Sequence, residues 1–239
     1  MTLERQPLYA RAEAELRARI ARGEWKPGEA LPTEPELAAD LGISQGTLRR
    51  AMAALERQRL IERRQGIGSH VAETTSEREL FHFFRAETPQ GGRLTPTSLA
   101  RGLETGRADA EEASDLGLDG TARVHRLTRE RRIDGVPRLM ELITLPEALF
   151  PGFAVPLDVE LADELYGRYQ REFGVTILRV EEKLQAVKAT AAIARALRRE
   201  EGWPLLLIHR IAFDVMDRPV ERRRSWLETT QLRYAIELR

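Results

Sequence analysis

Two short helices joined by a tight turn constrain the N-terminal part of this 239-residue chain more than any other feature. The first helix is predicted to begin at Thr33, because Thr33 and Glu36 have the spacing of a capping box, and to end at Gly42. The second is predicted to begin at Ser44, which can cap it. Helices connected in this way are typical of a helix-turn-helix, whose second helix enters a DNA groove.

The second helix has one apolar and one polar face. Leu48, Met52 and Leu55 recur at helical spacing, so the exposed residues at its start are Gln45, Gly46, Thr47, Arg49 and Arg50. A glycine inside a helix costs about 1 kcal/mol relative to alanine. Gly46 therefore indicates either a close approach of the backbone to a DNA phosphate or a frayed first turn that tolerates glycine.

A basic hairpin is predicted to follow, because residues 63–71 have the pattern of two short strands around a glycine turn. The segment around Gly66 and Gly68 has neither the third glycine nor the following helix of a nucleotide-binding loop, so a nucleotide site is not expected there. Residues 41–72 contain six arginines and two glutamates, a local net charge of +4, whereas the whole chain has 38 basic and 38 acidic residues. This local charge favours a wing that contacts the DNA backbone through Arg63 and Arg64.

These segments resemble the winged helix of the GntR family of bacterial transcription regulators. The matching runs are Leu31-Pro32-Thr33-Glu34, Glu36-Leu37-Ala38, Leu41-Gly42-Ile43-Ser44, Thr47-Leu48-Arg49-Arg50-Ala51, Leu60-Ile61 and Gly66-Ile67-Gly68-Ser69. The resemblance places six residues at positions that touch DNA, namely Thr33, Gln45, Thr47, Arg49, Gln65 and Gly66. The predicted DNA-binding set also includes Ser44, Gly46, Arg50 and Arg64, because they lie at the start of the second helix or in the basic hairpin.

Two positions depart from the family pattern. Pro35 and Gln45 both stand where family members often have an arginine. The contact at Pro35 is therefore expected to be missing or moved. Because glutamine suits adenine better than guanine, Gln45 predicts an operator that differs from those of arginine-rich relatives.

The chain is expected to form two domains. Residues 1–73, which include a predicted helix over Pro7–Arg22, would be the DNA-binding domain, and the polar, turn-prone residues 74–79 the linker. Residues 80–239 would form an effector-binding and dimerisation domain. Leu80–Phe84 opens that domain either as a buried strand or as an exposed aromatic patch.

The second domain is predicted to have an α+β fold with a mostly antiparallel sheet, because several strands adjoin through hairpin turns. Helices are expected over 108–116, 161–173 and 190–197. Strands are expected over 122–133, 137–145, 175–186, 205–215, 220–227 and 234–238.

The first hairpin of this domain places Arg129 and Arg131 on one face. Buried arginines either pair with carboxylates or bind an anion, and both interpretations stay open. A two-residue turn at Asp134–Gly135 would put Arg131 opposite Arg138. A three-residue loop, with Gly135 supplying a bulge, would put Glu141 opposite Arg129, and this longer loop is our prediction.

The same region resembles the UTRA effector domain, which marks the HutC subfamily of GntR regulators. The matching residues include Arg129-Glu130-Arg131, Asp134-Gly135-Val136-Pro137, Glu141, Leu145-Pro146, Phe150-Pro151-Gly152, Leu165-Tyr166, Arg210 and Pro219-Val220-Glu221. The resemblance implies a fold like chorismate lyase with a small anionic metabolite bound over the sheet. It implies that Arg129 and Arg131 hold the anion, that Tyr166 supports it, and that Glu141 and Glu221 take hydroxyl or amine groups. Ser98 falls on a loop expected to contact the anion.

Two departures bear on the ligand. Glu164 stands where relatives often have a serine that touches phosphate, and Leu227 where many have a tyrosine in the pocket. Because a carboxylate repels a phosphate, the sequence favours a smaller carboxylate or a zwitterion over a sugar phosphate.

The sequence thus predicts a ligand-responsive DNA-binding regulator, most simply a repressor, that acts as a homodimer on a pseudo-palindromic operator. No cofactor or metal is expected, because the chain has no cysteine and its four histidines are dispersed. The chain has no apolar run of about 20 residues and no apolar segment at its start, so a cytoplasmic location without membrane contact is expected.

Two other classes of protein fit the sequence less well than a regulator. An enzyme could use Ser225, His209 and Asp214 as a triad, but no nucleophile-elbow motif surrounds Ser225. An architectural DNA-binding protein without a ligand would leave Arg129 and Arg131 unexplained.

Overall fold

The computed structural model describes residues 6–75, 84–92, 94–161 and 165–236. Its contacts divide the chain into two compact units, which are described separately. The first comprises Met1–Thr74, Tyr166–Leu178 and Asp214–Arg218, and the second Thr75–Leu165, Arg179–Phe213 and Pro219–Arg239.

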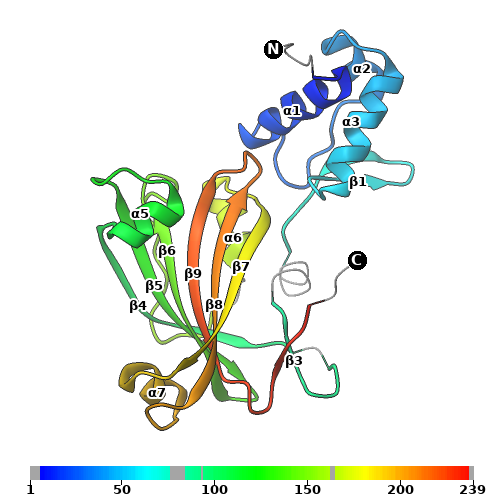
Figure 1. The fold of residues 1–239 in the computed structure, drawn as a ribbon. Coiled ribbons are helices and arrows are strands. Elements are labelled where there is room, and N and C mark those ends of the chain that lie inside the picture. Colours follow the sequence, from blue (N-terminus) through cyan, green and yellow to red (C-terminus); the bar gives the residue numbers. More distant parts are fainter. Residues whose placement is uncertain (1–5, 76–83, 93, 162–164, 237–239) are drawn as a thin grey trace, which may run out of the picture. The chain divides into compact units, whose positions relative to one another are not determined.

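Three helices and a hairpin make up most of the first unit (Figure 1). They are α1 (Leu8–Ala21), α2 (Glu34–Asp40), α3 (Gln45–Arg57), β1 (Ile61–Arg64) and β2 (Gly68–Val71). Thr33 and Glu36 form the predicted capping box of α2, and Ser44 caps α3 by accepting from the N–H of Thr47. The predicted helix-turn-helix and basic hairpin are therefore confirmed.

The apolar face of α3 forms the core of this unit. Leu48, Met52 and Leu55 are each at most 1% exposed and pack in one cluster with Leu16 of α1 and Leu37 of α2. Packing of this kind fixes which side of α3 faces outward, because residues three and four positions apart lie on the same face of a helix.

The first unit also contains α6 (Leu165–Phe173) from Tyr166 onward, which holds the segment that follows the hairpin. The Gln170 side chain accepts from the N–H of Thr74 (2.7 Å) and donates to the carbonyl of Ala72 (3.1 Å). A Cβ on Gly167 would lie 2.9 Å from the carbonyl oxygen of Thr74, so only glycine permits this approach. Residues 72–74 are therefore anchored to a helix that lies about a hundred residues later in the chain.

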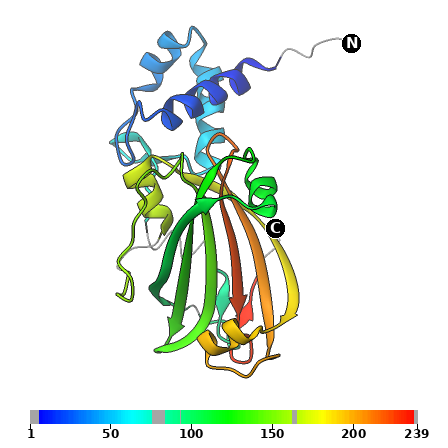
Figure 2. The same cartoon turned by 90° about the vertical axis from the view of Figure 1, so that its left-hand side faces the viewer.

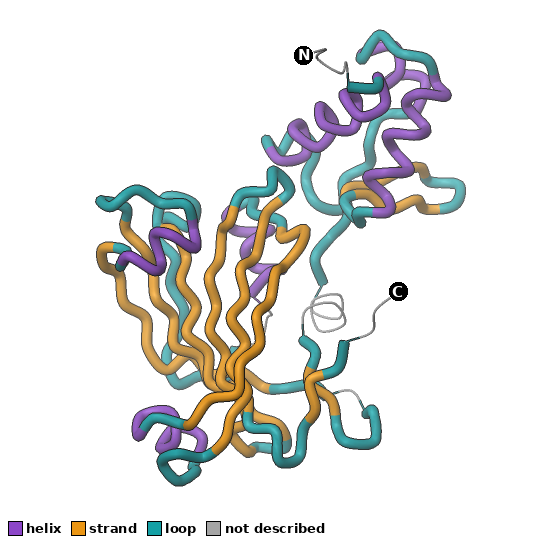
Figure 3. Tube along the Cα trace, in the orientation of Figure 1, coloured by secondary structure: helices purple, strands orange, loops and turns teal. Residues whose placement is uncertain are grey.

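A six-stranded sheet in the order β4-β5-β6-β9-β8-β7 dominates the second unit (Figures 2 and 3). Its strands are β4 (Thr97–Arg107), β5 (Arg123–Ile133), β6 (Val136–Pro146), β7 (Ile177–Lys188), β8 (Pro204–Asp214) and β9 (Pro219–Leu227). The pairs β4–β5, β5–β6, β6–β9 and β8–β9 are all antiparallel. The predicted α+β fold with an antiparallel sheet is confirmed.

Two short helices lie at opposite ends of this sheet, α5 (Ala110–Leu116) and α7 (Ala191–Leu197) (Figure 1). Two further strands, β3 (Ala86–Glu87) and β10 (Arg233–Tyr234), pair with each other. Most of the strand predicted over Leu80–Phe84 lies outside the described residues, as do the last residues of the strand predicted over 234–238.

The sequence did not predict β4, and Ser98, which was expected on a loop, lies in this strand. This strand contains Gly102 and Gly106, and its pairing with β5 shifts register between Ala100 and Gly102. Glycines weaken a strand signal and often mark a bulge, so the local pattern did not indicate a strand.

The β5–β6 hairpin corrects one prediction. Asp134 and Gly135 form a two-residue turn in which both φ angles are positive (52° and 74°), and Ile133 pairs with Val136. The predicted three-residue loop is therefore wrong, because this pair of residues fits the tight turn whose twist matches the strands. The extra residue lies instead at Arg138, where the register shifts between Arg131 and Arg132. Glu141 consequently does pair with Arg129, as predicted.

Candidate nucleic-acid interface and ligand site

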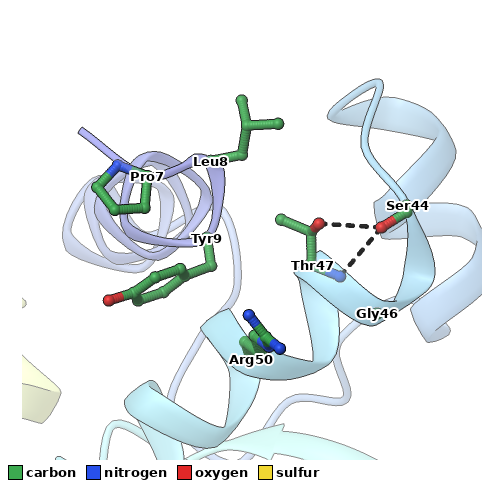
Figure 4. A pocket seen from close by; sticks show the side chains of 7 residues that line it. All are labelled: Pro7, Leu8, Tyr9, Ser44, Gly46, Thr47 and Arg50. Carbon is green, nitrogen blue, oxygen red and sulfur yellow. Dashed lines mark hydrogen bonds between the residues drawn. The ribbon is translucent and has the colours of Figure 1, made fainter. Parts of the chain in front are cut away.

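The start of α3 presents polar groups to solvent. The Ser44 hydroxyl oxygen accepts from the N–H of Thr47 (3.2 Å) and is hydrogen-bonded to the Thr47 hydroxyl (2.9 Å) (Figure 4). Gln45, Gly46 and Arg50 are exposed beside them. The capped first turn thus carries groups that can donate to and accept from base edges and phosphates.

Gly46 is not required by its surroundings within the protein. A Cβ added there would meet only the Ser44 hydroxyl oxygen, at 3.9 Å. The chain therefore keeps a poor helix former where alanine would fit. This favours the explanation that another molecule approaches the backbone closely at this point.

Glu34 holds together two arginines from different elements. Its carboxylate accepts from Arg49 Nε of α3 (2.7 Å) and from Arg63 of β1 (3.2 Å). Both arginine side chains remain about half exposed or more, at 64% and 46%. The pairing orders two cations beside one another on the outer surface of the winged helix.

The hairpin turn carries the remaining predicted DNA-binding residues. Arg64 pairs with Glu62 at 2.5 Å, and Gln65 and Gly66 are exposed at the tip. Gly66 has a φ of +75°, a conformation that favours glycine. The predicted DNA-binding residues thus occupy three places in the first unit: the start of α2, the start of α3 and the tip of the hairpin.

A second polar cluster lies on one face of the sheet, and its side chains are buried in the protein. Five of the six residues predicted to bind the effector share this face by strand register and alternation, and each is at most 5% exposed: Ser98, Arg129, Arg131, Glu141 and Glu221. The sixth, Tyr166, is in α6, is fully buried and lies with its ring 5.7 Å from that of Tyr169. Tyr166 belongs to the first compact unit rather than to the sheet.

Glu141 is the centre of the cluster. Its carboxylate accepts from Arg129 Nε (2.6 Å), from Arg223 (3.4 Å) and from the hydroxyl of Ser225 (3.3 Å). Arg223 also donates to both carboxylate oxygens of Glu221, at 2.9 and 2.7 Å. The face therefore alternates cations and anions across β5, β6 and β9.

Ser98 and Arg131 lie opposite each other at the edge of this cluster. The Ser98 hydroxyl is buried and has no hydrogen-bond partner among the described residues. The Arg131 guanidinium group lies over the ring of Phe84, 4.5 Å from its centroid. A buried hydroxyl without a partner is uncommon in proteins, and this one can donate to or accept from a bound molecule.

Comparison with known proteins settles the family. Residues 8–71 match the bacterial regulatory proteins of the gntR family, and residues 92–233, more than half of the chain, match the UTRA domain. The chain belongs to the GntR family of transcription regulators with a UTRA domain. The members of this family are regulators and not enzymes.

Individual relatives agree with this assignment. The regulator Rv0792c of Mycobacterium tuberculosis is 32% identical over 215 residues, which cover 88% of this chain and 77% of the relative. The regulator SmoD of Agrobacterium fabrum is 29% identical over 98% of this chain and 97% of its own. The crystal structure of the ligand-binding domain of a GntR-family regulator from Bordetella bronchiseptica is 33% identical, with a TM-score of 0.63, and covers 66% of this chain and 98% of that domain.

The polar cluster of this GntR regulator also contains Arg223, which the sequence did not single out, and Ser225, which it suggested only as a nucleophile. The alternation of β9 contains the signal that would have found them. Glu221, Arg223, Ser225 and Leu227 are every second residue of one strand and therefore face the same side. Leu227 is buried in an apolar cluster with Leu139 and Ile208. Glu164, the other departure noted in the sequence, lies outside the described residues.

The triad considered for an enzyme is not assembled in the regulator. Ser225 pairs with Ile208 and His209 with Arg224, so Ser225 and His209 face opposite sides of the sheet. Asp214 instead accepts from the backbone N–H groups of Met216 and Arg218 in the turn between β8 and β9. In the described part of the chain, no three histidine, aspartate or glutamate side chains gather as a metal site would require. None of the described helices has the length and apolar composition needed to cross a bilayer.

Burial on its own would raise the pKa of Glu141, but the guanidinium groups of Arg129, Arg223 and Arg131 lower it far below its usual range. The carboxylate is therefore charged in the folded regulator at every physiological pH. Its charge stabilises the folded form fully above the ordinary pKa of 4.5, and this contribution falls as the pH drops below that value.

We expect Glu141→Gln to lower the free energy of unfolding by about 3–5 kcal/mol at pH 7, because it removes the buried negative charge to which Arg129 and Arg223 both donate. The difference from the wild type should shrink as the pH falls below about 4.5, because the carboxyl group then binds a proton in the unfolded wild-type chain while it stays charged in the folded one. Urea unfolding followed by circular dichroism measures both effects. Glu181→Gln, at an exposed position of β7, is the control. Parallel pH curves for the wild type and Glu141→Gln would contradict this role.

Gly46→Ala should separate stability from DNA binding. Alanine raises the helix propensity of α3 by up to about 1 kcal/mol, so the melting temperature should rise. Its methyl group would occupy the open space outside the backbone, so we expect binding to an operator fragment to weaken at least tenfold. Ala53→Gly, at an exposed site of the same helix, should lower stability and leave DNA affinity unchanged. Unchanged DNA affinity of Gly46→Ala would show that nothing approaches this glycine.

Proposed function

We propose that this GntR regulator is a repressor whose affinity for its operator is changed by a small anionic metabolite bound at the sheet. The observation that carries the proposal is the polar interior of the sheet face, where Arg129, Glu141 and Arg223 stand in place of an apolar core. Buried ion pairs are often no more stable than apolar residues of similar size, so stability alone gives little reason to keep them. A ligand site gives such a reason.

In the proposed domain organisation, residues 1–73 bind DNA, residues 74–79 link the domains, and residues 80–239 bind the effector and dimerise. Gln45 and Thr47 would contact base edges, and Arg49 and Arg50 phosphates or guanine. The capped turn around Ser44 and Gly46, together with Thr33, would lie against the backbone, as would Arg64, Gln65 and Gly66 of the wing. One helix-turn-helix reads only a few base pairs, so a homodimer on a pseudo-palindrome is proposed. The protein would act in the cytoplasm.

The ligand would present a carboxylate or phosphate to Arg129 and Arg131, with Ser98 donating a further hydrogen bond. Glu141 and Glu221 would accept from a hydroxyl or amine group, and their ion pairs with Arg129 and Arg223 would keep the cations oriented. Tyr166 would support the ligand from α6.

α6 offers a physical route for regulation. It carries Tyr166, and its Gln170 binds the backbone of Ala72 and Thr74 directly after the wing. Effector binding would change how the two winged helices of the dimer are spaced through the 74–79 linker, which begins at this anchored segment. Linkage then requires that a ligand that lowers the affinity for DNA binds less tightly to the DNA-bound form.

Arg49→Ala should weaken binding to an operator fragment at least tenfold, in line with about 1–3 kcal/mol for a lost charged contact. Protein stability should be nearly unaffected, since the ion pair of Arg49 with Glu34 is exposed. Gel-shift titration with Arg57→Ala, at the other end of α3, as the control tests the assignment. An unchanged affinity would remove Arg49 from the interface.

Ser98→Ala should abolish or strongly reduce ligand binding without destabilising the fold, because the Ser98 hydroxyl has no partner among the described residues. Thermal-shift screening against small carboxylates, amino acids and sugar phosphates would identify a ligand by the stability it adds. The same titration with Ser98→Ala should need at least tenfold more of that ligand. Thr105→Ala, on the same strand, is the control. An equal response of the two variants and the wild type would place the ligand elsewhere.

A further inference from the structure

An open hollow of about 520 Å³ lies between the starts of α1 and α3 (Figure 4). Its lining consists of the N-cap Pro7 with Leu8 and Tyr9 of α1, and of the N-cap Ser44 with Gly46, Thr47 and Arg50 of α3. Among the residues that the structure describes, no carboxylate contributes to this lining, and the first turn of α1 contains no acidic residue. The hollow is therefore positive in charge through Arg50, and the positive ends of two helix dipoles add to this.

The shape of the hollow matters as much as its charge. Figure 4 shows Arg50 on the α3 side, whereas the Tyr9 ring lies on the α1 side with its hydroxyl directed away from α3. The polar groups therefore do not converge on one point, and the apolar side chains of Pro7 and Leu8 also contribute to the lining. A single small ion would need converging donors. A chain in which charged and apolar groups alternate fits better.

Two large side chains of α1 are exposed at this hollow, Leu8 at 57% and Tyr9 at 39%. They add nothing to the core of the winged helix, whose α1 residues are Leu16, Ile20 and Ala21. Their exposure beside the residues expected to contact DNA indicates a surface that another molecule covers.

We propose that this hollow binds a stretch of the sugar–phosphate backbone of the operator, with Arg50 on one phosphate, the Tyr9 hydroxyl on a neighbouring phosphate and Leu8 against the deoxyribose. The inference rests on the proposed function, because it requires α3 to enter the DNA groove. It adds α1 to the DNA-binding surface and assigns Arg50 to the backbone rather than to guanine. The contact is independent of sequence, so it should position α3 without selecting bases.

Salt dependence of DNA binding tests this assignment on the full chain. Arg50→Gln should reduce the slope of log K against log salt concentration by about 1, since one phosphate contact is lost. Tyr9→Phe should weaken binding three- to tenfold, by the same factor for the operator and for a scrambled duplex. Arg57→Gln, on the same helix but outside the hollow, should change neither quantity. Melting temperatures of all variants should match the wild type, because these side chains are exposed.

Wild-type affinity of Tyr9→Phe together with an unchanged salt slope of Arg50→Gln would overturn the inference. Loss of discrimination between operator and scrambled duplex in Arg50→Gln would overturn the backbone assignment, because it would mean that Arg50 reads a base. Stabilisation by inorganic phosphate alone that depends on Tyr9 and Arg50, without an effect of Tyr9→Phe on DNA binding, would show a site for a free anion instead. Failure of the wild type to prefer any duplex would count against the proposed function itself.

Discussion

The buried pairing of Glu141 with Arg129 and Arg223 is the interaction on which the sheet depends. Charges this deep in a protein are tolerated only when they are paired and hydrogen-bonded. The pairing requires β5, β6 and β9 to keep one register, because a slip of one residue would turn every side chain to the other face. The pairing of β4 with β5 in turn places Ser98 opposite Arg131. The buried ion pairs therefore favour this strand register, and the register in turn brings the paired side chains together.

The winged helix depends on a different kind of interaction. Its three helices share an apolar core, which leaves the start of α3 and the tip of the hairpin exposed for contact with DNA. α6 joins this unit through Gln170 and through the close approach that Gly167 permits. α6 is thus held to the segment after the wing by a small set of hydrogen bonds that a conformational change can break.

Local signals were enough to predict much of this from the sequence. Capping residues and helical spacing located α2 and α3, and alternation put Arg129 and Arg131 on one face. Two features were missed because their cause is not local. Arg138 forms a bulge that sequence alone assigned to the turn, and the Gln170–Thr74 hydrogen bond joins residues 96 positions apart. The proposed contact of Tyr9 has no local signal either, because an aromatic residue at the start of a helix is informative only once its neighbours in space are known.

The most direct test of the account is the reciprocity between ligand and operator. A ligand identified by its thermal stabilisation should change the operator dissociation constant by at least about fivefold, and operator DNA should change the ligand dissociation constant by the same factor. Isothermal titration of the full chain, with and without each partner, measures both constants. The account predicts that the factor for the operator and the factor for the ligand are equal and differ from 1. A ligand that binds the free and the DNA-bound regulator with the same affinity would contradict it.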